Sequence, residues 1–164
     1  SNLLSVLLFT SQMMSTLNEK SFAQLSPTSL IHLDQTIKRI AAIDRIFLIS
    51  LPARVDRRTT SIALFQTLHL DLVIVPALHP QSAEVLSRRH HLLRHPRLSP
   101  LELACWASHM QLWTHIALTS TSNDSWTLIF EDDVDVEMAM VEIVESFPHE
   151  VWTRAEMIYL GYCG

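Results

Sequence analysis

Glycine is almost absent from this 164-residue sequence: the chain has only Gly161 and Gly164, both within the last four positions. Glycine-rich phosphate-binding loops, such as the Walker A loop and the GxGxxG fingerprint, are therefore excluded upstream of these residues. The same scarcity excludes collagen-like chains and Gly/Ser linkers. Two cysteines are too few for a scaffold stapled by disulfides. Most enzymes that cradle phosphates on a glycine-rich turn are thus ruled out.

Basic charge is also scarce. The chain has 12 Lys and Arg against 17 Asp and Glu, for a net charge of −5, which argues against a general nucleic-acid binder. Because 48% of the residues are hydrophobic and only 18% are charged, the sequence is not a disordered acidic tail. Its length predicts one domain with a substantial core.

The chain opens on a hydrophobic run, residues 3–9, which is far shorter than the about 20 residues that span a bilayer. It lacks the basic flank of a secretory signal. Two interpretations stay open: a partial signal anchor, through which the protein would associate with a membrane, or a frayed hydrophobic terminus. We expect an apolar and then Ser/Thr-rich arm over residues 1–42, followed by one folded domain over residues 43–164.

Apolar runs alternate with helical patterns along that domain. Four short runs predict buried strands, at residues 46–49, 72–75, 126–130 and 157–160. Strands that alternate with helices indicate an α/β fold, a mostly parallel sheet flanked by helices.

Two segments between these strands have the spacing of helices, residues 54–68 and 99–117. The second begins with a capping box, in which Ser99 is the N-cap, Pro100 the first helical residue and Glu102 the third. Apolar residues form two stripes along it, so we expect packing on two sides. The stripes make three residues candidate core positions: Cys105, Trp106 and Trp113.

Carboxylates gather directly after the strand at residues 126–130, where open α/β sheets bind their ligands. If the chain stays extended here, successive side chains point to opposite sides of the strand. Asp132 then lies on one side, and the other side carries Glu131, Asp133 and Asp135. Converging carboxylates repel one another, and a divalent cation removes the conflict. Oxygen ligands favour Mg²⁺, Mn²⁺ or Ca²⁺ over zinc. The alternative is the acidic first turn of a helix that starts near Asp135.

Three blocks in order resemble glycosyltransferase family 25, which contains lipopolysaccharide and procollagen galactosyltransferases. They are IFLISLPARVDRR at residues 46–58, LSPLELACWASH with a later Trp at residues 98–113, and LIFEDDVD at residues 128–135. The ending IYLGYC, residues 158–163, is similar to an L-G-x-C stretch of fungal members, to which the chain looks closest. The resemblance runs from about Ile43 to the C-terminus.

The resemblance implies a GT-A-like nucleotide-sugar-binding fold, a UDP-sugar donor (galactose is usual) and Mn²⁺ or Mg²⁺. In that picture Glu131, Asp132 and Asp133 stand in for the D-x-D element that bridges the ion to the diphosphate, and we expect Asp133 and Asp135 to be the metal ligands. The resemblance places the donor on Arg54, Asp56, Arg57, Arg58, Ser108, His109, Glu131 and Asp132. A cation and arginines would stabilise the charge that develops on the departing diphosphate.

For several of these residues a purely structural role stays open. Arg57 and Arg58 also suit a solvated helix start, and Asp56 an arginine partner or a helix cap. His109 is also consistent with a buried histidine that is hydrogen-bonded within the core. Because neighbouring side chains on a helix point apart, Ser108 and His109 do not predict a catalytic dyad.

The expected activity is hexose transfer to a glycan, lipid-linked or protein acceptor. The family continues past the L-G-x-C stretch, so we expect the catalytic base beyond the C-terminus; Leu101 and Ala104 stand where the family often has glycine. The alternative is a truncated, inactive donor-binding or interaction module. A Mg²⁺-dependent phosphohydrolase using Asp133 and Asp135 is a third hypothesis, but it needs an aspartate on the first strand, which has none before Asp56.

Three further features carry weaker hypotheses. The basic stretch at residues 88–97 indicates a solvated loop, a diphosphate or acceptor contact, or a metal between His91 and His95. Cys105 is either a core thiol or a disulfide partner of Cys163. The N-glycosylation sequon at residues 123–125 favours a location in the lumen of the secretory pathway.

Overall fold

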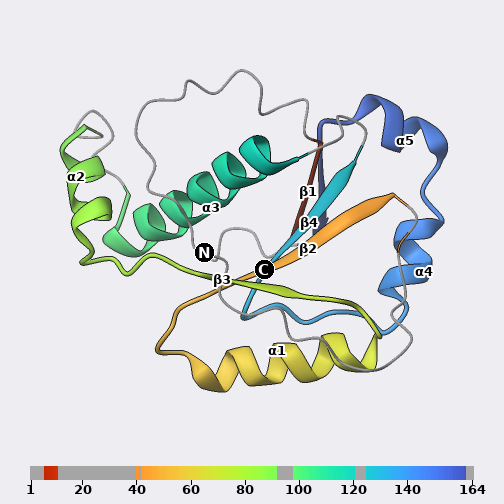
Figure 1. Ribbon diagram of the computed structural model, residues 1–164, viewed down its shortest axis with the longest axis horizontal. Coiled ribbons are helices and arrows are strands. Elements are labelled where there is room, and N and C mark those ends of the chain that lie inside the picture. Colours follow the sequence, from red (N-terminus) through yellow and green to blue (C-terminus); the bar gives the residue numbers. More distant parts are fainter. Residues whose placement is uncertain (1–5, 11–39, 41, 92–97, 121–124, 162–164) are drawn as a thin grey trace.

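The computed structural model describes residues 6–10, 40, 42–91, 98–120 and 125–161. In this part of the chain a five-stranded sheet has the order β3-β2-β4-β1-β5. The strands are β1 (Val6–Thr10), β2 (Ile43–Ser50), β3 (Val73–Pro76), β4 (Trp126–Glu131) and β5 (Met157–Gly161). The helices are α1 (Val55–Thr67), α2 (Ala83–His91), α3 (Pro100–Thr119), α4 (Met140–Glu145) and α5 (His149–Arg154). Figure 1 shows α1 and α3 on opposite faces of the sheet.

The predicted α/β fold is confirmed. Strand β2 pairs in parallel with both β3 and β4, so these three strands end at one edge of the sheet. Each of the four predicted strands is present, within three residues of its expected bounds, and the helices expected at residues 54–68 and 99–117 are α1 and α3. Parallel strands flanked by helices are consistent with a GT-A-like domain.

Strand β1 was not predicted. It lies within the segment expected to be an arm, yet it pairs antiparallel with β4 on one side and β5 on the other. Its sequence, Val-Leu-Leu-Phe-Thr, is rich in residues that favour strands. The hydrophobic opening of the chain therefore contributes a strand inside the sheet rather than a frayed terminus.

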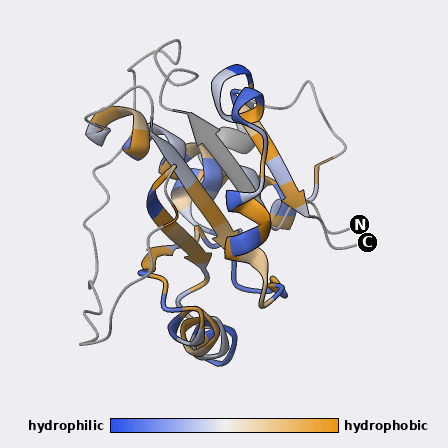
Figure 2. Cartoon of the chain, turned by 90° about the vertical axis from the view of Figure 1, so that its right-hand side faces the viewer, coloured by the Kyte–Doolittle hydropathy of each residue, from blue (hydrophilic) through white to orange (hydrophobic). Residues whose placement is uncertain are grey.

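Alternation along the strands divides the core in two. Leu48 and Phe130 pack with Phe65 of α1 in a cluster that also takes in α4. Ile49 and Ile129, one position away, pack instead with residues of α3, Leu112 and Ile116. Strands β2 and β4 are thus buried on both faces, as expected for a sheet between two helical layers. Figure 2 shows the hydrophobic character of these inner strands.

Helix α3 begins as the sequence predicts. The hydroxyl of Ser99 accepts a hydrogen bond from the Glu102 amide at 3.2 Å, and the Glu102 carboxylate accepts one from the Ser99 amide at 2.7 Å. The expected burial is wrong for Trp106, which is 41% exposed, and Leu101 of the second stripe is 69% exposed. Trp113 does pack against the cluster that Ile49 and Ile129 form with α3. Stripe position alone did not indicate which side of the helix faces the sheet.

Two local predictions are wrong. The helix that the alternative interpretation started near Asp135 begins instead at Met140, after a turn and an irregular stretch. Residues 88–91 belong to the last turn of α2 rather than to a loop. His95, Cys163 and Asn123 lie outside the described residues, so their hypotheses stay predictions, although Cys105 carries a free thiol. Among the described residues, no helix combines the length and hydrophobicity that crossing a bilayer requires.

Candidate functional site

The candidate site lies at the carboxyl edge of the three parallel strands. Ile49 of β2 pairs with Glu131, the last residue of β4, and Ser50 pairs with Pro76 at the end of β3. Helix α1 starts five residues after β2 ends, so its first turn stands at the same edge. Crevices at this edge are where open α/β sheets bind ligands.

The acidic cluster does not continue the strand. The Val134 amide donates a hydrogen bond to the Glu131 carbonyl at 3.3 Å, which closes a turn around Asp132 and Asp133. We call these two aspartates the acidic turn. The alternation expected for an extended chain is therefore wrong beyond Glu131: Asp133 lies on the α1 side with Asp132, and Asp135 follows exposed to solvent.

One arginine of α1 meets both aspartates of the acidic turn. Arg57 Nη1 lies 3.3 Å from an Asp133 oxygen and 3.7 Å from Asp132 Oδ1. The Asp132 side chain is only 12% exposed, and its Oδ2 is buried without a hydrogen-bond partner among the described residues. Because an unsatisfied buried carboxylate oxygen is unfavourable, this atom marks a place for a cation or a hydrogen-bond donor.

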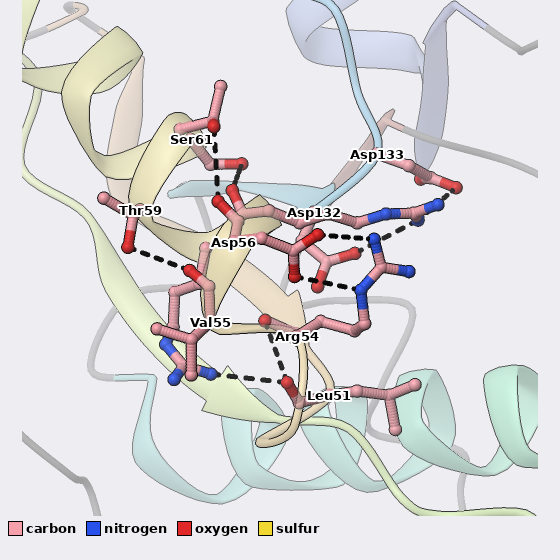
Figure 3. Close-up of polar contacts among 12 residues, drawn as sticks. Leu51, Arg54, Val55, Asp56, Thr59, Ser61, Asp132 and Asp133 are labelled. Atoms are coloured by element: carbon pink, nitrogen blue, oxygen red, sulfur yellow. Dashed lines mark hydrogen bonds and ion pairs between the residues drawn. The ribbon is translucent and has the colours of Figure 1, made fainter.

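Arg54 and Asp56 form a second ion pair just before and within α1. The guanidinium donates two hydrogen bonds to the carboxylate, at 3.0 Å and 2.8 Å, as Figure 3 shows. The Arg54 hydrogen bond lowers the pKa of Asp56 to about 2. Asp56 and, more weakly, Asp132 and Asp133 raise the pKa of Arg54. Of the interpretations open for Asp56, the structure therefore shows the pairing with an arginine.

Two of the expected donor-binding residues, Arg58 and Ser108, form hydrogen bonds with the backbone of neighbouring segments. Arg58 donates to the carbonyls of Leu51 and Pro52, at 3.3 Å and 3.4 Å, and so braces the loop between β2 and α1. The buried hydroxyl of Ser108 accepts a hydrogen bond from the Leu78 amide at 2.8 Å. In this structure both side chains shape segments that border the site.

His109 and Glu131 meet on the other side of β4, towards α3. His109 Nε2 lies 2.9 Å from Glu131 Oε1, and His109 is only 6% exposed. Ser108 bonds elsewhere, so the two neighbours form no dyad, as expected. Glu131 is therefore separated from the acidic turn by the direction of its side chain.

Cys105 is the residue of this group that sequence reasoning missed. Its thiol donates a hydrogen bond to Glu131 Oε1 at 3.5 Å. Burial, reinforced by the Glu131 charge, raises the pKa of the thiol to about 12. The spacing of four between Cys105 and His109 put both on one helix face and was the available signal; the apolar stripe was given more weight.

The oxygen donors of the acidic turn suit a hard divalent cation. Asp132 and Asp133 come from consecutive residues, Asp135 stands two residues further on, and the unpartnered Asp132 oxygen leaves ligand capacity at the site. Carboxylates without sulfur or nitrogen ligands favour Mn²⁺ or Mg²⁺. The chemistry of these oxygen donors therefore suits the expected ion, whereas Cys105, His109 and Glu131 are the group among the described residues whose three ligand atoms lie within 4.8 Å of one another.

Comparison with known proteins gives one family. Residues 43–163 match the sequence profile described as glycosyltransferase family 25 (LPS biosynthesis protein). Procollagen galactosyltransferases 1-A and 1-B of Xenopus laevis are 26% and 25% identical to the chain over 150 and 151 residues. These alignments cover 84% of this chain and 24% of each relative, so the chain spans about a quarter of the length of the curated relatives it matches. No solved structure matches significantly. Closeness to fungal members stays a prediction.

Proposed function

The chain belongs to glycosyltransferase family 25, and from this premise we propose that it binds a UDP-hexose, with Mn²⁺ or Mg²⁺, for transfer of the hexose to an acceptor. Galactose is the proposed sugar, since both curated relatives are named galactosyltransferases. Those names also make a protein acceptor one of three candidates, beside a glycan and a lipid-linked acceptor. Residues 43–164 supply the donor-binding part of this activity.

The observation that carries the proposal is the acidic turn facing Arg57. A buried carboxylate oxygen without a partner, an adjacent aspartate and an arginine converge at the carboxyl edge of the parallel sheet. A diphosphate needs cations to bind it, and a divalent cation needs carboxylates to hold it. The acidic turn and Arg57 bring both kinds of group to one place.

Each group has a distinct proposed role. Asp133 and Asp135 hold the ion, with Asp132 Oδ2 as a further ligand. The ion supplies Lewis-acid stabilisation of the negative charge that develops on the departing diphosphate. Arg57 stays beside the carboxylates and offers its remaining N–H groups to phosphate oxygens. Arg54, held by Asp56, offers its remaining N–H groups on the same side, and Arg58 and Ser108 keep the bordering loops in position.

Calorimetric titration of the chain with UDP tests this proposal. The titration is run under three conditions: in the presence of Mn²⁺, of Mg²⁺ and of a chelator. We expect the metal to tighten UDP binding at least about tenfold, because ion and diphosphate stabilise each other in the site. Equal affinities under all three conditions would contradict it. A panel of UDP-sugars in the same titration identifies the hexose.

Release of hexose from the selected donor, with and without candidate acceptors, then separates an active transferase from a donor-binding module. Metal-dependent binding without any transfer or donor hydrolysis would favour the module.

A further inference from the structure

Three side chains with metal-ligating atoms meet where α3 crosses the end of β4. The thiol of Cys105, the imidazole of His109 and the carboxylate of Glu131, which we call the thiol cluster, place one ligand atom each within 4.8 Å of one another. Cys105 and His109 are four residues apart on α3 and so share a face. Glu131 reaches them from β4, on the side away from Arg57.

The spacing of these atoms suits a tetrahedral ion. Ligands of tetrahedral zinc lie about 3.3–3.6 Å apart, given its bond lengths to sulfur, nitrogen and oxygen. The sulfur of Cys105 is 3.5 Å from Glu131 Oε1, and His109 Nε2 is 2.9 Å from the same oxygen. Of these two distances, the second has to lengthen by about 0.4 Å, and the Glu131 side chain that sets it is 21% exposed. The Cys105 sulfur and the His109 nitrogen lie within 4.8 Å of each other.

The donor set selects a different metal from that of the acidic turn. A thiolate and an imidazole are ligands for zinc, whereas manganese and magnesium prefer oxygen. Charge agrees with this choice: a thiolate, a carboxylate and a neutral imidazole carry two negative charges, which Zn²⁺ neutralises. A neutral site avoids the penalty of leaving isolated charge beside the buried His109.

We propose that Cys105, His109 and Glu131 form a zinc site whose fourth position is open to water. Binding forms a Zn–S bond, and the thiol proton leaves to solvent. The ion fastens the last residue of β4 to α3, and thereby fixes the strand end from which the acidic turn begins. Without the metal, the same atoms make the His109–Glu131 and Cys105–Glu131 hydrogen bonds, while the buried Nδ1 of His109 has no partner among the described residues.

Zinc content and affinity test the site without any nucleotide. The chain is produced without a histidine tag, equilibrated with buffered Zn²⁺ and analysed by elemental mass spectrometry, then titrated against a zinc chelator. We expect one zinc per chain, and Cys105→Ser to weaken binding by about 100-fold, since even indirect contacts to a metal change affinity by about 10- to 100-fold. Cys163→Ser, the matched cysteine control, and Asp133→Asn should keep the zinc.

Cobalt supplies a direct signature of the sulfur ligand. Co²⁺ bound in place of zinc should give a near-ultraviolet thiolate-to-metal charge-transfer band in the wild type and in Cys163→Ser, and none in Cys105→Ser. If Cys105→Ser does not fold, zinc should still slow alkylation of Cys105 in the Cys163→Ser chain. A wild type that binds no zinc, or zinc lost with Asp133→Asn and kept with Cys105→Ser, would overturn the site. Neither result would touch the UDP titration, so the two proposals fail separately.

Discussion

Asp133→Asn is expected to remove the effect of Mn²⁺ on UDP affinity, with a loss of about 100-fold in the presence of the metal. The amide keeps the shape of the side chain but loses the charge that holds the ion. Asp133 is also the nearer of the two aspartates to Arg57, at 3.3 Å against 3.7 Å, so the substitution weakens the pairing that orients the arginine. Calorimetric titration of UDP with and without Mn²⁺ measures the effect.

Asp44→Asn is the matched control for this substitution. Asp44 lies near the start of β2, at the opposite end of the strand from the acidic turn, and its carboxylate pairs with Arg45 at 3.3 Å. We expect this variant to keep both the affinity and its metal dependence. Metal dependence that survives in Asp133→Asn would refute the assigned role of the acidic turn.

Phe130→Ala should lower the free energy of unfolding by about 3–5 kcal/mol, the largest stability change we expect from a single truncation. Phe130 is only 1% exposed, and its ring meets that of Phe65 at 4.8 Å in an edge-to-face arrangement. Removing it opens a cavity between β4 and α1, two residues before the acidic turn begins. Because a domain has only about 5–15 kcal/mol of stability, urea denaturation should show a large shift of the midpoint.

Leu118→Ala serves as the control for that cavity. Leu118 is 68% exposed on α3, so its truncation should change the free energy of unfolding by no more than about 0.5 kcal/mol. Similar effects from the two substitutions would mean that the cluster between α1 and β4 is not the core of the fold.

Local signals explain why so much of the fold was predictable. The strand at residues 126–130 and the capping box at Ser99 depend on neighbouring residues, and each was placed correctly. Strand β1 depends on pairing with β4 and β5, more than 100 positions away along the chain, and no local pattern indicates such partners. Its apolar character was visible, but its place in the sheet was not.

The site was predictable in position but not in its pairings. A strand followed by carboxylates indicated the correct edge of the sheet. Asp132 and Asp133 are residues that favour turns, but the alternation of an extended strand was given more weight, and it assigned Asp133 to the wrong side. The contacts of Arg57 with these aspartates and of Cys105 with Glu131 join distant segments. Only the packing of α1 and α3 against opposite faces of β4 determines them.

The most direct measurement is the position of manganese in crystals grown with Mn²⁺ and UDP, from anomalous scattering at the manganese absorption edge. The ion should be bonded to carboxylate oxygens of the acidic turn, with the diphosphate between it and Arg57. A peak at the thiol cluster alone, or UDP bound with no ion beside Asp132 and Asp133, would contradict this assignment.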